Sequence, residues 1–258
     1  MRLEDRVAIV TGGSRGIGRA YTERFLREGA SVVIADVDDV SGAATADELA
    51  SLGAVQYVHC DVADPESAEG CARATADRFG RVDILVNNAA LYGDWDMANQ
   101  SFEYLKQVFD VNQHGVWLMT RAVAPYMVEQ EYGRIVNQAS AAAYNYRAQP
   151  SGDGFAGLNA FSYQQTKWGV VGLTKFAAAQ LGRWNITVNC VAPGVIATEA
   201  TLKVVPREIL ETLAEQQAVP GVLHATDLTG VVTFFVSEEA RFVTGQVLVV
   251  DGGKYMPA

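Results

Sequence analysis

The chain has 258 residues, of which 49% are hydrophobic, so it is long enough to bury a substantial core. Its 30 acidic residues outnumber its 20 basic residues, and the formal net charge is −10. This acidic balance argues against nucleic acid and anionic membranes as partners, and it also suits plain solubility. No segment approaches the roughly 20 apolar residues of a membrane span. The N-terminus lacks the apolar region of a signal peptide, so we expect a cytoplasmic protein.

Short β-branched runs alternate with longer helical stretches along the chain. The runs are almost continuously apolar, as in strands that are buried on both faces of a sheet. Such alternation indicates βαβ units with right-handed crossovers. We therefore predict an α/β fold in which residues 1–258 form one domain with a doubly wound parallel sheet. The expected strands are 7–10, 32–35, 55–59, 84–86, 134–137, 186–191 and 247–250, and the expected helices are 17–28, 43–52, 65–79, 102–128, 160–181 and 227–236.

A glycine-rich turn, TGGSRGIG at residues 11–18, joins the first expected strand to the first expected helix. Glycine lets the backbone turn sharply and approach a pyrophosphate closely, while the amides and dipole of the helix N-terminus face the anion. The alternative is a tight turn without a ligand, but its place between strand and helix favours a dinucleotide. We assign Gly12, Ser14, Arg15, Gly16, Ile17 and Gly18 to the cofactor site.

An acidic residue, Asp36, ends the second expected strand. A carboxylate there can accept hydrogen bonds from the adenosine ribose hydroxyls and would repel the additional phosphate of NADP. Val37 follows it instead of a basic residue, so we predict NAD as the cofactor. Arg15 would favour NADP, since a guanidinium in the turn can pair with a 2′-phosphate. Asp36 is the stronger indication, because its charge is placed directly at the ribose hydroxyl.

Tyr163 and Lys167 are four residues apart in a segment that we expect to be helical. Positions i and i+4 share one helix face, so both side chains can address the same small volume. A nearby ammonium favours the phenolate and brings the tyrosine pKa, about 10 in isolation, closer to working pH. Tyr163 is therefore the candidate general acid and base. Taken singly, the tyrosine also suits packing and the lysine a solvated surface.

These motifs, in this order, resemble the classical short-chain dehydrogenase/reductase (SDR) family over nearly the whole chain. Residues 11–18 match its TGxxxGxG motif, and residues 87–90 match NNAG with an alanine in place of the glycine. Residues 163–167 match YxxSK with a threonine in place of the serine. Residues 243–246 and 251–253 match the segment around the last strand of the family. Both replacements are small.

The resemblance implies a Rossmann-like fold of about seven strands in the order 3-2-1-4-5-6-7, flanked by helices. It implies that Lys167 also binds the nicotinamide ribose, that Ser140 fixes the substrate oxygen, and that Asn112 holds a water that links Lys167 to solvent. It also implies a homodimer or homotetramer. The further cofactor contacts that it implies are Asp61 and Val62 at the adenine, Asn88 and Ala89 in the cleft, and Pro193, Gly194, Ile196 and Thr198 near the nicotinamide.

The chain departs from the family between Ser140 and Tyr163, which lie further apart than in most members. Gly, Pro, Ser and Asp mark residues 144–157 as a loop, which we expect either to wall the substrate pocket or to lie at a surface or subunit contact. The segment 199–220 is expected to cover the pocket as a lid, or else to pack on the core as an amphipathic helix. The candidate pocket residues are Tyr92, Trp95, Tyr144, Tyr146, Phe155 and Leu202.

Three functions are consistent with these observations. The first is an NAD-dependent alcohol dehydrogenase or ketone reductase, and the lack of a basic cluster near the pocket favours an uncharged, fairly apolar secondary alcohol or ketone. The second is a 3-oxoacyl thioester reductase, acting on an acyl carrier protein, which Asp36 disfavours because those enzymes typically use NADP. The third is a dinucleotide-sensing scaffold, which would be expected to lose Tyr163, Lys167 or Ser140. The scattered cysteines and histidines predict no metal site and reduced thiols.

Overall fold

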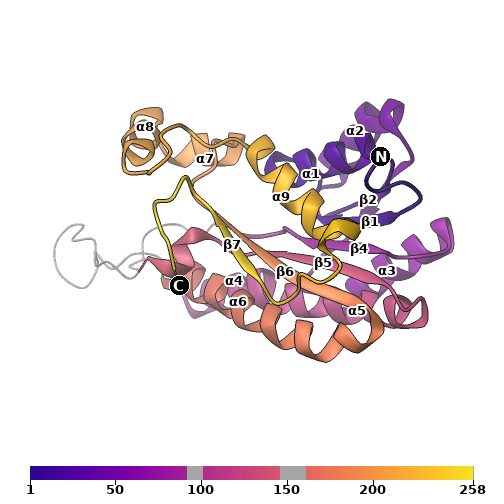
Figure 1. The fold of residues 1–258 in the computed structure, drawn as a ribbon. Helices are drawn as coiled ribbons and strands as arrows, with labels where there is room; N and C mark the ends of the chain where they lie inside the picture. The colour runs from indigo at the N-terminus through magenta and orange to yellow at the C-terminus, as the bar shows by residue number, and fades with distance from the viewer. Residues whose placement is uncertain (92–100, 146–160, 258) are drawn as a thin grey trace.

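A seven-stranded, fully parallel sheet organises the chain, and the strand order is β3-β2-β1-β4-β5-β6-β7. The computed structural model describes residues 1–91, 101–145 and 161–257 (Figure 1). The predicted order and number of strands are confirmed. The strands are β1 (Val7–Thr11), β2 (Ser31–Asp36), β3 (Val55–His59), β4 (Ile84–Asn87), β5 (Gly133–Gln138), β6 (Ile186–Pro193) and β7 (Val247–Val250).

Helices cover both faces of the sheet (Figure 1). One face carries α1 (Gly16–Arg27), α2 (Asp39–Leu49) and α9 (Ala225–Val236), and α1 packs extensively on α9. The opposite face carries α3 (Pro65–Phe79), α4 (Phe102–Phe109), α5 (Gly115–Glu129) and α6 (Phe161–Leu181). Two short helices, α7 (Glu199–Val204) and α8 (Arg207–Glu215), follow β6 and project beyond the end of the sheet.

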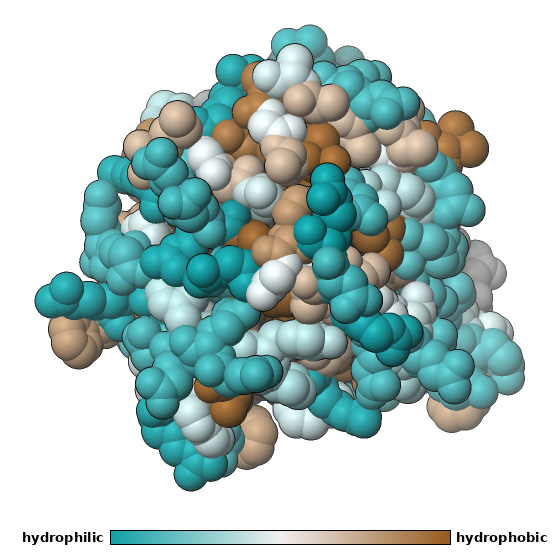
Figure 2. Space-filling model, turned by 90° about the vertical axis from the view of Figure 1, so that its right-hand side faces the viewer, coloured by the Kyte–Doolittle hydropathy of each residue, from teal (hydrophilic) through white to brown (hydrophobic). Residues whose placement is uncertain are grey.

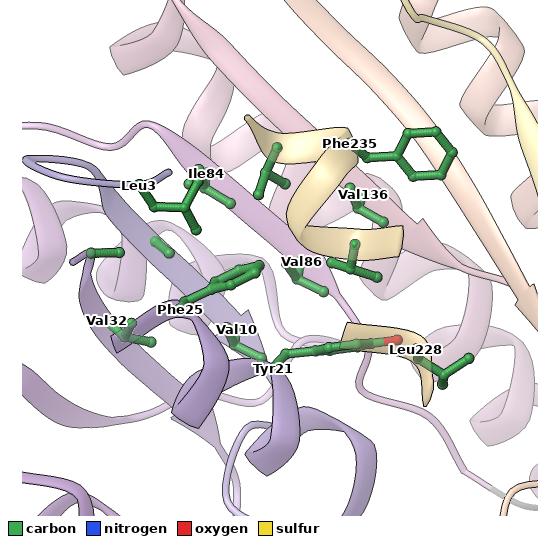
Figure 3. Packing of buried hydrophobic residues seen from close by; sticks show 14 of the residues in the cluster. Leu3, Val10, Tyr21, Phe25, Val32, Ile84, Val86, Val136, Leu228 and Phe235 are labelled. Atoms are coloured by element: carbon green, nitrogen blue, oxygen red, sulfur yellow. The ribbon is translucent and has the colours of Figure 1, made fainter. Parts of the chain in front are cut away.

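Each face of the sheet has its own apolar core. Tyr21 and Phe25 of α1 pack with strand residues and α9 in one core, part of which Figure 3 shows. The other core gathers side chains of α3, α5 and α6 against the opposite face of the strands. The outermost strands differ from the expectation of complete burial, because β3 and β7 have neighbours on one side only and are only partly buried. Hydrophilic residues cover most of the face in Figure 2.

The long helix expected over residues 102–128 is interrupted. A π-helical segment, η3 (Asp110–His114), separates α4 from α5 and contains the buried Asn112. Single turns of π-helix are rare and are frequently found at functional sites, because the extra residue redirects side chains and backbone groups. Apolar periodicity, which remains nearly helical through such a turn, does not reveal it. Within the described residues, every helix is too short or too polar to cross a membrane.

A buried carboxylate, Asp83, connects the N-terminal ends of the central strands β1 and β4. It is fully buried, and it accepts the amide of Val7 at 2.9 Å and two hydrogen bonds from the Arg81 guanidinium at 2.7 Å each. We expect Asp83→Ala to lower the free energy of unfolding by about 2 kcal/mol, since it leaves the buried amide of Val7 without a partner and removes the bonds to the partly exposed Arg81. Urea unfolding measures the change.

The matched control for Asp83→Ala is Glu69→Ala. Glu69 pairs with Arg121 at 3.3 Å, but more than half of each side chain is exposed. Its removal is expected to cost less than about 1 kcal/mol, because solvent screens such pairs. Equal losses for the two variants would contradict the role assigned to Asp83.

Candidate active site

The glycine-rich turn at the start of α1 lets other groups approach its backbone closely. Gly12 and Gly16 have φ angles of 61° and 53°, which glycine adopts without strain. A Cβ atom on Gly18 would lie 2.0 Å from the carbonyl oxygen of Gly12, so only glycine fits there. The helix itself begins without a side-chain cap at Arg15, whereas Asp38 and Asp64 cap α2 and α3. Its first amides therefore suit an anion such as a pyrophosphate.

Asp36 lies beside this turn and is bonded to Ser14 within it. It is 9% exposed at the end of β2, and its carboxylate accepts the hydroxyl and the amide of Ser14. The amide of Asp38 also donates to it, at 3.2 Å. Arg15 turns to Asp38 instead, with a separation of 3.0 Å between Nη2 and Oδ2. The acidic groups at this end therefore outnumber the one guanidinium.

The segment after β4 is tied to the turn. The Asn88 side chain donates to the carbonyl oxygens of Thr11, at 2.9 Å, and of Gly12, at 3.1 Å. The Thr11 hydroxyl accepts the amides of Asn88 and Ala89, both at 3.0 Å. These bonds fix the predicted cleft residues Asn88 and Ala89 against the predicted pyrophosphate turn.

Lys167 is 2% exposed, which is rare for a lysine. It lies on α6, and its Nζ donates to the carbonyl oxygen of Gln138 at 2.9 Å. The same Nζ lies 5.6 Å from the centroid of the Tyr163 ring, so the predicted pair is together. Burial lowers the pKa of Lys167 to about 8, and the nearby Cys190 opposes part of this shift. The lysine can therefore exchange its proton at mildly alkaline pH.

Two further predicted site residues, Ser140 and Asn112, bind backbone groups with their side chains. Ser140 follows β5 two residues after Gln138, and its Oγ accepts the amide of Ala142 at 3.1 Å, which starts the short helix η4 (Ala141–Tyr144). The Asn112 side chain binds both backbone groups of Leu91, at 2.7 and 3.0 Å. This use of Asn112 was not expected. Both polar groups of the Asn112 side chain are therefore engaged within the chain.

A threonine links Asn112 to the first turn of α6. Asn112 Nδ2 lies 3.5 Å from Thr166 Oγ1, and the Thr166 hydroxyl donates to the carbonyl oxygen of Tyr163 at 2.9 Å. The threonine that replaces the family's serine is therefore fully buried and engaged. Its contacts hold the helix turn that carries Tyr163.

The loop after β6 lies against the glycine-rich turn. Pro193 is the last residue of β6, and a Cβ atom on Gly194 would lie 2.9 Å from Asp251 Cβ. A Cβ atom on Gly16 would lie 3.5 Å from Thr198 Cγ2, so Thr198 borders the turn and also caps α7. Ile196 is buried. Of the two residues predicted to border the adenine, Val62 is buried, whereas Asp61 is exposed and accepts the amide of Ala63.

The predicted pocket residues are only partly placed. The Tyr144 ring packs edge-on against Trp168 of α6, with 5.4 Å between centroids. Leu202 on α7 is 50% exposed. Tyr92, Trp95, Tyr146 and Phe155 lie outside the described residues. Among the described residues, no cluster of His, Cys, Asp or Glu could hold a metal ion.

Comparisons with known proteins agree with this architecture. Residues 12–254 match a family profile described as enoyl-(acyl carrier protein) reductase. An uncharacterized oxidoreductase of Mycobacterium tuberculosis is 39% identical, with 98% of each chain covered. The (2S)-[(R)-hydroxy(phenyl)methyl]succinyl-CoA dehydrogenase subunit BbsD of Thauera aromatica is 37% identical, again over 98% of each chain. The (+)-borneol dehydrogenase 2 of Salvia officinalis is 35% identical, over 98% of this chain and 90% of its own.

The parallel sheet, the glycine-rich turn and these relatives define an oxidoreductase fold of the nicotinamide-dependent kind. The chain belongs to the short-chain dehydrogenase/reductase family.

Proposed function

We propose that the chain transfers a hydride between NAD(H) and the carbon of a secondary alcohol or ketone. The observation that carries the proposal is the buried Lys167 ammonium, 5.6 Å from the Tyr163 ring, at the sheet edge that also holds the glycine-rich turn. Burying a lysine is costly, so its retention next to a phenol points to proton chemistry. When bound, the nicotinamide would supply or accept the hydride.

The proton is handled by the chain itself. Tyr163 removes the hydroxyl proton of an alcohol, or returns a proton to the oxygen in the reverse direction. Lys167 stabilises the Tyr163 phenolate and holds the nicotinamide ribose. Ser140 holds the substrate oxygen within reach of the Tyr163 oxygen. The proton then leaves through Lys167 and a water on the π-helical backbone near Asn112. The uncapped start of α1 and Asp36 hold the pyrophosphate and the adenosine ribose.

We propose NAD instead of NADP because of the charges around Asp36. A 2′-phosphate would meet the Asp36 carboxylate, and the one guanidinium in the turn, Arg15, is paired with Asp38 at 3.0 Å. Asp38 is held in that position because it also caps α2 through Ser41. We expect a kcat/KM for NAD⁺ about 100-fold or more above that for NADP⁺, the effect of two or three kcal/mol of charge repulsion.

Asp38→Asn tests this arrangement of charges. Asparagine keeps the helix cap but releases Arg15, so kcat/KM for NADP⁺ should rise about tenfold, the effect of one charge-assisted hydrogen bond. Activity with NAD⁺ should change less than about twofold, because Asp36 is untouched. Adding Arg15→Ala to Asp38→Asn should abolish the gain. A gain that survives the second substitution would show that Arg15 is not responsible.

The substrate is proposed to be uncharged and fairly apolar. One relative is a dehydrogenase named for borneol, an uncharged cyclic alcohol, which supports this proposal. Another is named for a phenyl-bearing succinyl-CoA thioester, which is charged. The described candidates for the pocket are an aromatic ring, Tyr144, and an aliphatic side chain, Leu202. The profile is named for an enoyl-(acyl carrier protein) reductase, and its carrier-bound thioester substrate supports the second candidate, a 3-oxoacyl thioester reductase.

A spectrophotometric assay separates these functions. Oxidation of cyclic and benzylic secondary alcohols with NAD⁺, followed by NADH absorbance, is the expected result. Preferential reduction of 3-oxoacyl thioesters with NADPH would support the reductase. NAD⁺ binding without turnover on either panel would support a sensing scaffold.

We also propose a cytoplasmic homotetramer or homodimer. Trp117 of α5 and Trp168 and Phe176 of α6 are 42%, 47% and 55% exposed on neighbouring helices, which favours a further contact. Sedimentation equilibrium measures the assembly.

A further inference from the structure

A series of hydrogen-bonded polar side chains, buried or partly buried, connects α1 with the ends of β5 and β4. It begins at Tyr21 on α1, whose hydroxyl donates to Gln138 Oε1 at 2.7 Å. The Gln138 amide in turn donates to Asn88 Oδ1 at 3.0 Å. Asn88 then donates to the carbonyl oxygens of Thr11 and Gly12 in the glycine-rich turn. We call Tyr21, Gln138 and Asn88 the crossing network.

The other end of the network is Lys167. Gln138 is the last residue of β5, and its side chain and its carbonyl oxygen serve two different sites. The side chain reaches Tyr21 in the core around α1, while the carbonyl oxygen accepts Lys167 Nζ at 2.9 Å from α6 on the opposite face. Gln138 thus contacts the network that leads to the turn through its side chain and Lys167 through its backbone.

Tyr21 lies in an apolar core, where its hydroxyl indicates a specific role for this residue. It is fully buried, and Figure 3 shows its ring among Val10, Val86 and Leu228. Burial raises its pKa well above the ordinary value, so the hydroxyl remains a donor at all working pH values. A phenylalanine would fill the same apolar space without a polar group to satisfy.

We propose that Tyr21 and Gln138 are positioning residues, which set the glycine-rich turn and Lys167 at the separation that one dinucleotide spans. This inference rests on the proposed function, in which the turn holds the pyrophosphate and Lys167 holds the nicotinamide ribose. Neither residue contacts the reacting atoms. Without the Tyr21 hydroxyl the Gln138 amide keeps only its bond to Asn88, so that bond is less firmly oriented and the turn is less precisely fixed relative to β5.

The test compares a ligand that spans both ends with one that reaches a single end. Dissociation constants for NAD⁺ and for adenosine monophosphate are measured by calorimetry on wild type and Tyr21→Phe. We expect the Kd of Tyr21→Phe for NAD⁺ to rise about fivefold, the effect of one hydrogen bond, and its Kd for adenosine monophosphate to change less than twofold. In the alcohol assay KM for NAD⁺ should rise by a similar factor, with kcat at saturation nearly unchanged.

Tyr132→Phe is the matched control. Tyr132 is a buried tyrosine just before β5, at the other end of this strand from Gln138. Its substitution therefore removes a buried hydroxyl without affecting the crossing network. Its affinity for NAD⁺ should be that of wild type. Gln138→Met removes both side-chain bonds of the glutamine at similar length, and it serves as the test should Tyr21→Phe fold poorly. Tyr21→Phe should add nothing further in the Gln138→Met background, since both act through Gln138.

Two results would overturn the inference. One is an unchanged affinity for NAD⁺ in Tyr21→Phe, and the other is an equal loss for NAD⁺ and adenosine monophosphate, which a general loosening would cause. A wild-type protein that binds no nicotinamide dinucleotide would instead overturn the proposed function, so the two failures are distinct.

Discussion

Tyr163→Phe is expected to reduce kcat by about 10³-fold, within the range that general acid-base groups contribute. The substitution removes one oxygen and keeps the ring that faces Lys167 Nζ at 5.6 Å. NAD⁺ should therefore bind with a Kd within about twofold of wild type, because coenzyme binding does not depend on the phenolic proton. Stopped-flow absorbance for turnover and calorimetry for binding measure the two quantities separately.

Tyr126→Phe provides the comparison for Tyr163→Phe. Tyr126 is a partly buried tyrosine of α5 that packs against the core, and its loss should leave kcat nearly unchanged. Retention of more than a tenth of wild-type kcat by Tyr163→Phe would remove Tyr163 from the mechanism.

Lys167→Met is expected to abolish turnover and yet stabilise the protein at neutral pH. The pKa of Lys167 is about 8 in the folded chain, against an ordinary value of 10.5. Folding at pH 7 therefore retains a charge in an unfavourable site, which costs about 3 kcal/mol when 2.5 pKa units are converted. Methionine removes this cost but also the bond to Gln138, so a net gain of about 1–2 kcal/mol is expected. Urea unfolding of the coenzyme-free protein measures it.

The gain should depend on pH in a defined direction. Because the folded pKa is lower than the unfolded one, the destabilisation by Lys167 is complete below about pH 8 and fades as the pH rises toward 10.5. Lys167→Met should thus lose its advantage between those values. Lys175→Met changes an exposed lysine two turns further along α6 and should show no such trend. A Lys167→Met protein that is less stable than wild type at pH 7 would contradict the assignment.

The strands were predictable because parallel strands that helices cover on both faces appear in the sequence as nearly continuous β-branched, apolar runs. The runs at 55–59 and 247–250 were placed correctly, but their partial exposure depends on having a neighbour on one side only, which is a property of the sheet order. The π-helical segment at Asp110–His114 changes the backbone path without changing the apolar pattern, so it left no trace in the sequence.

The site residues of the motifs were predictable because short spacings on one element bring side chains together, as with Tyr163 and Lys167. Gln138 was missed, although a polar side chain at the end of an apolar strand run is the signal that would have indicated it. The role of its partner Tyr21 was not predictable, since the sequence does not distinguish it from an ordinary core tyrosine of an amphipathic helix. Contacts between distant elements follow from packing, which spacing alone does not encode.

Asp83 and Arg81 lie at the N-terminal ends of the strands, whereas the glycine-rich turn follows the C-terminal end of β1. This cluster contributes stability at a distance from the glycine-rich turn and Lys167. A lineage adapting to a hotter or colder habitat can therefore adjust stability there by single substitutions that leave the candidate active site unchanged, and protein engineers have the same freedom.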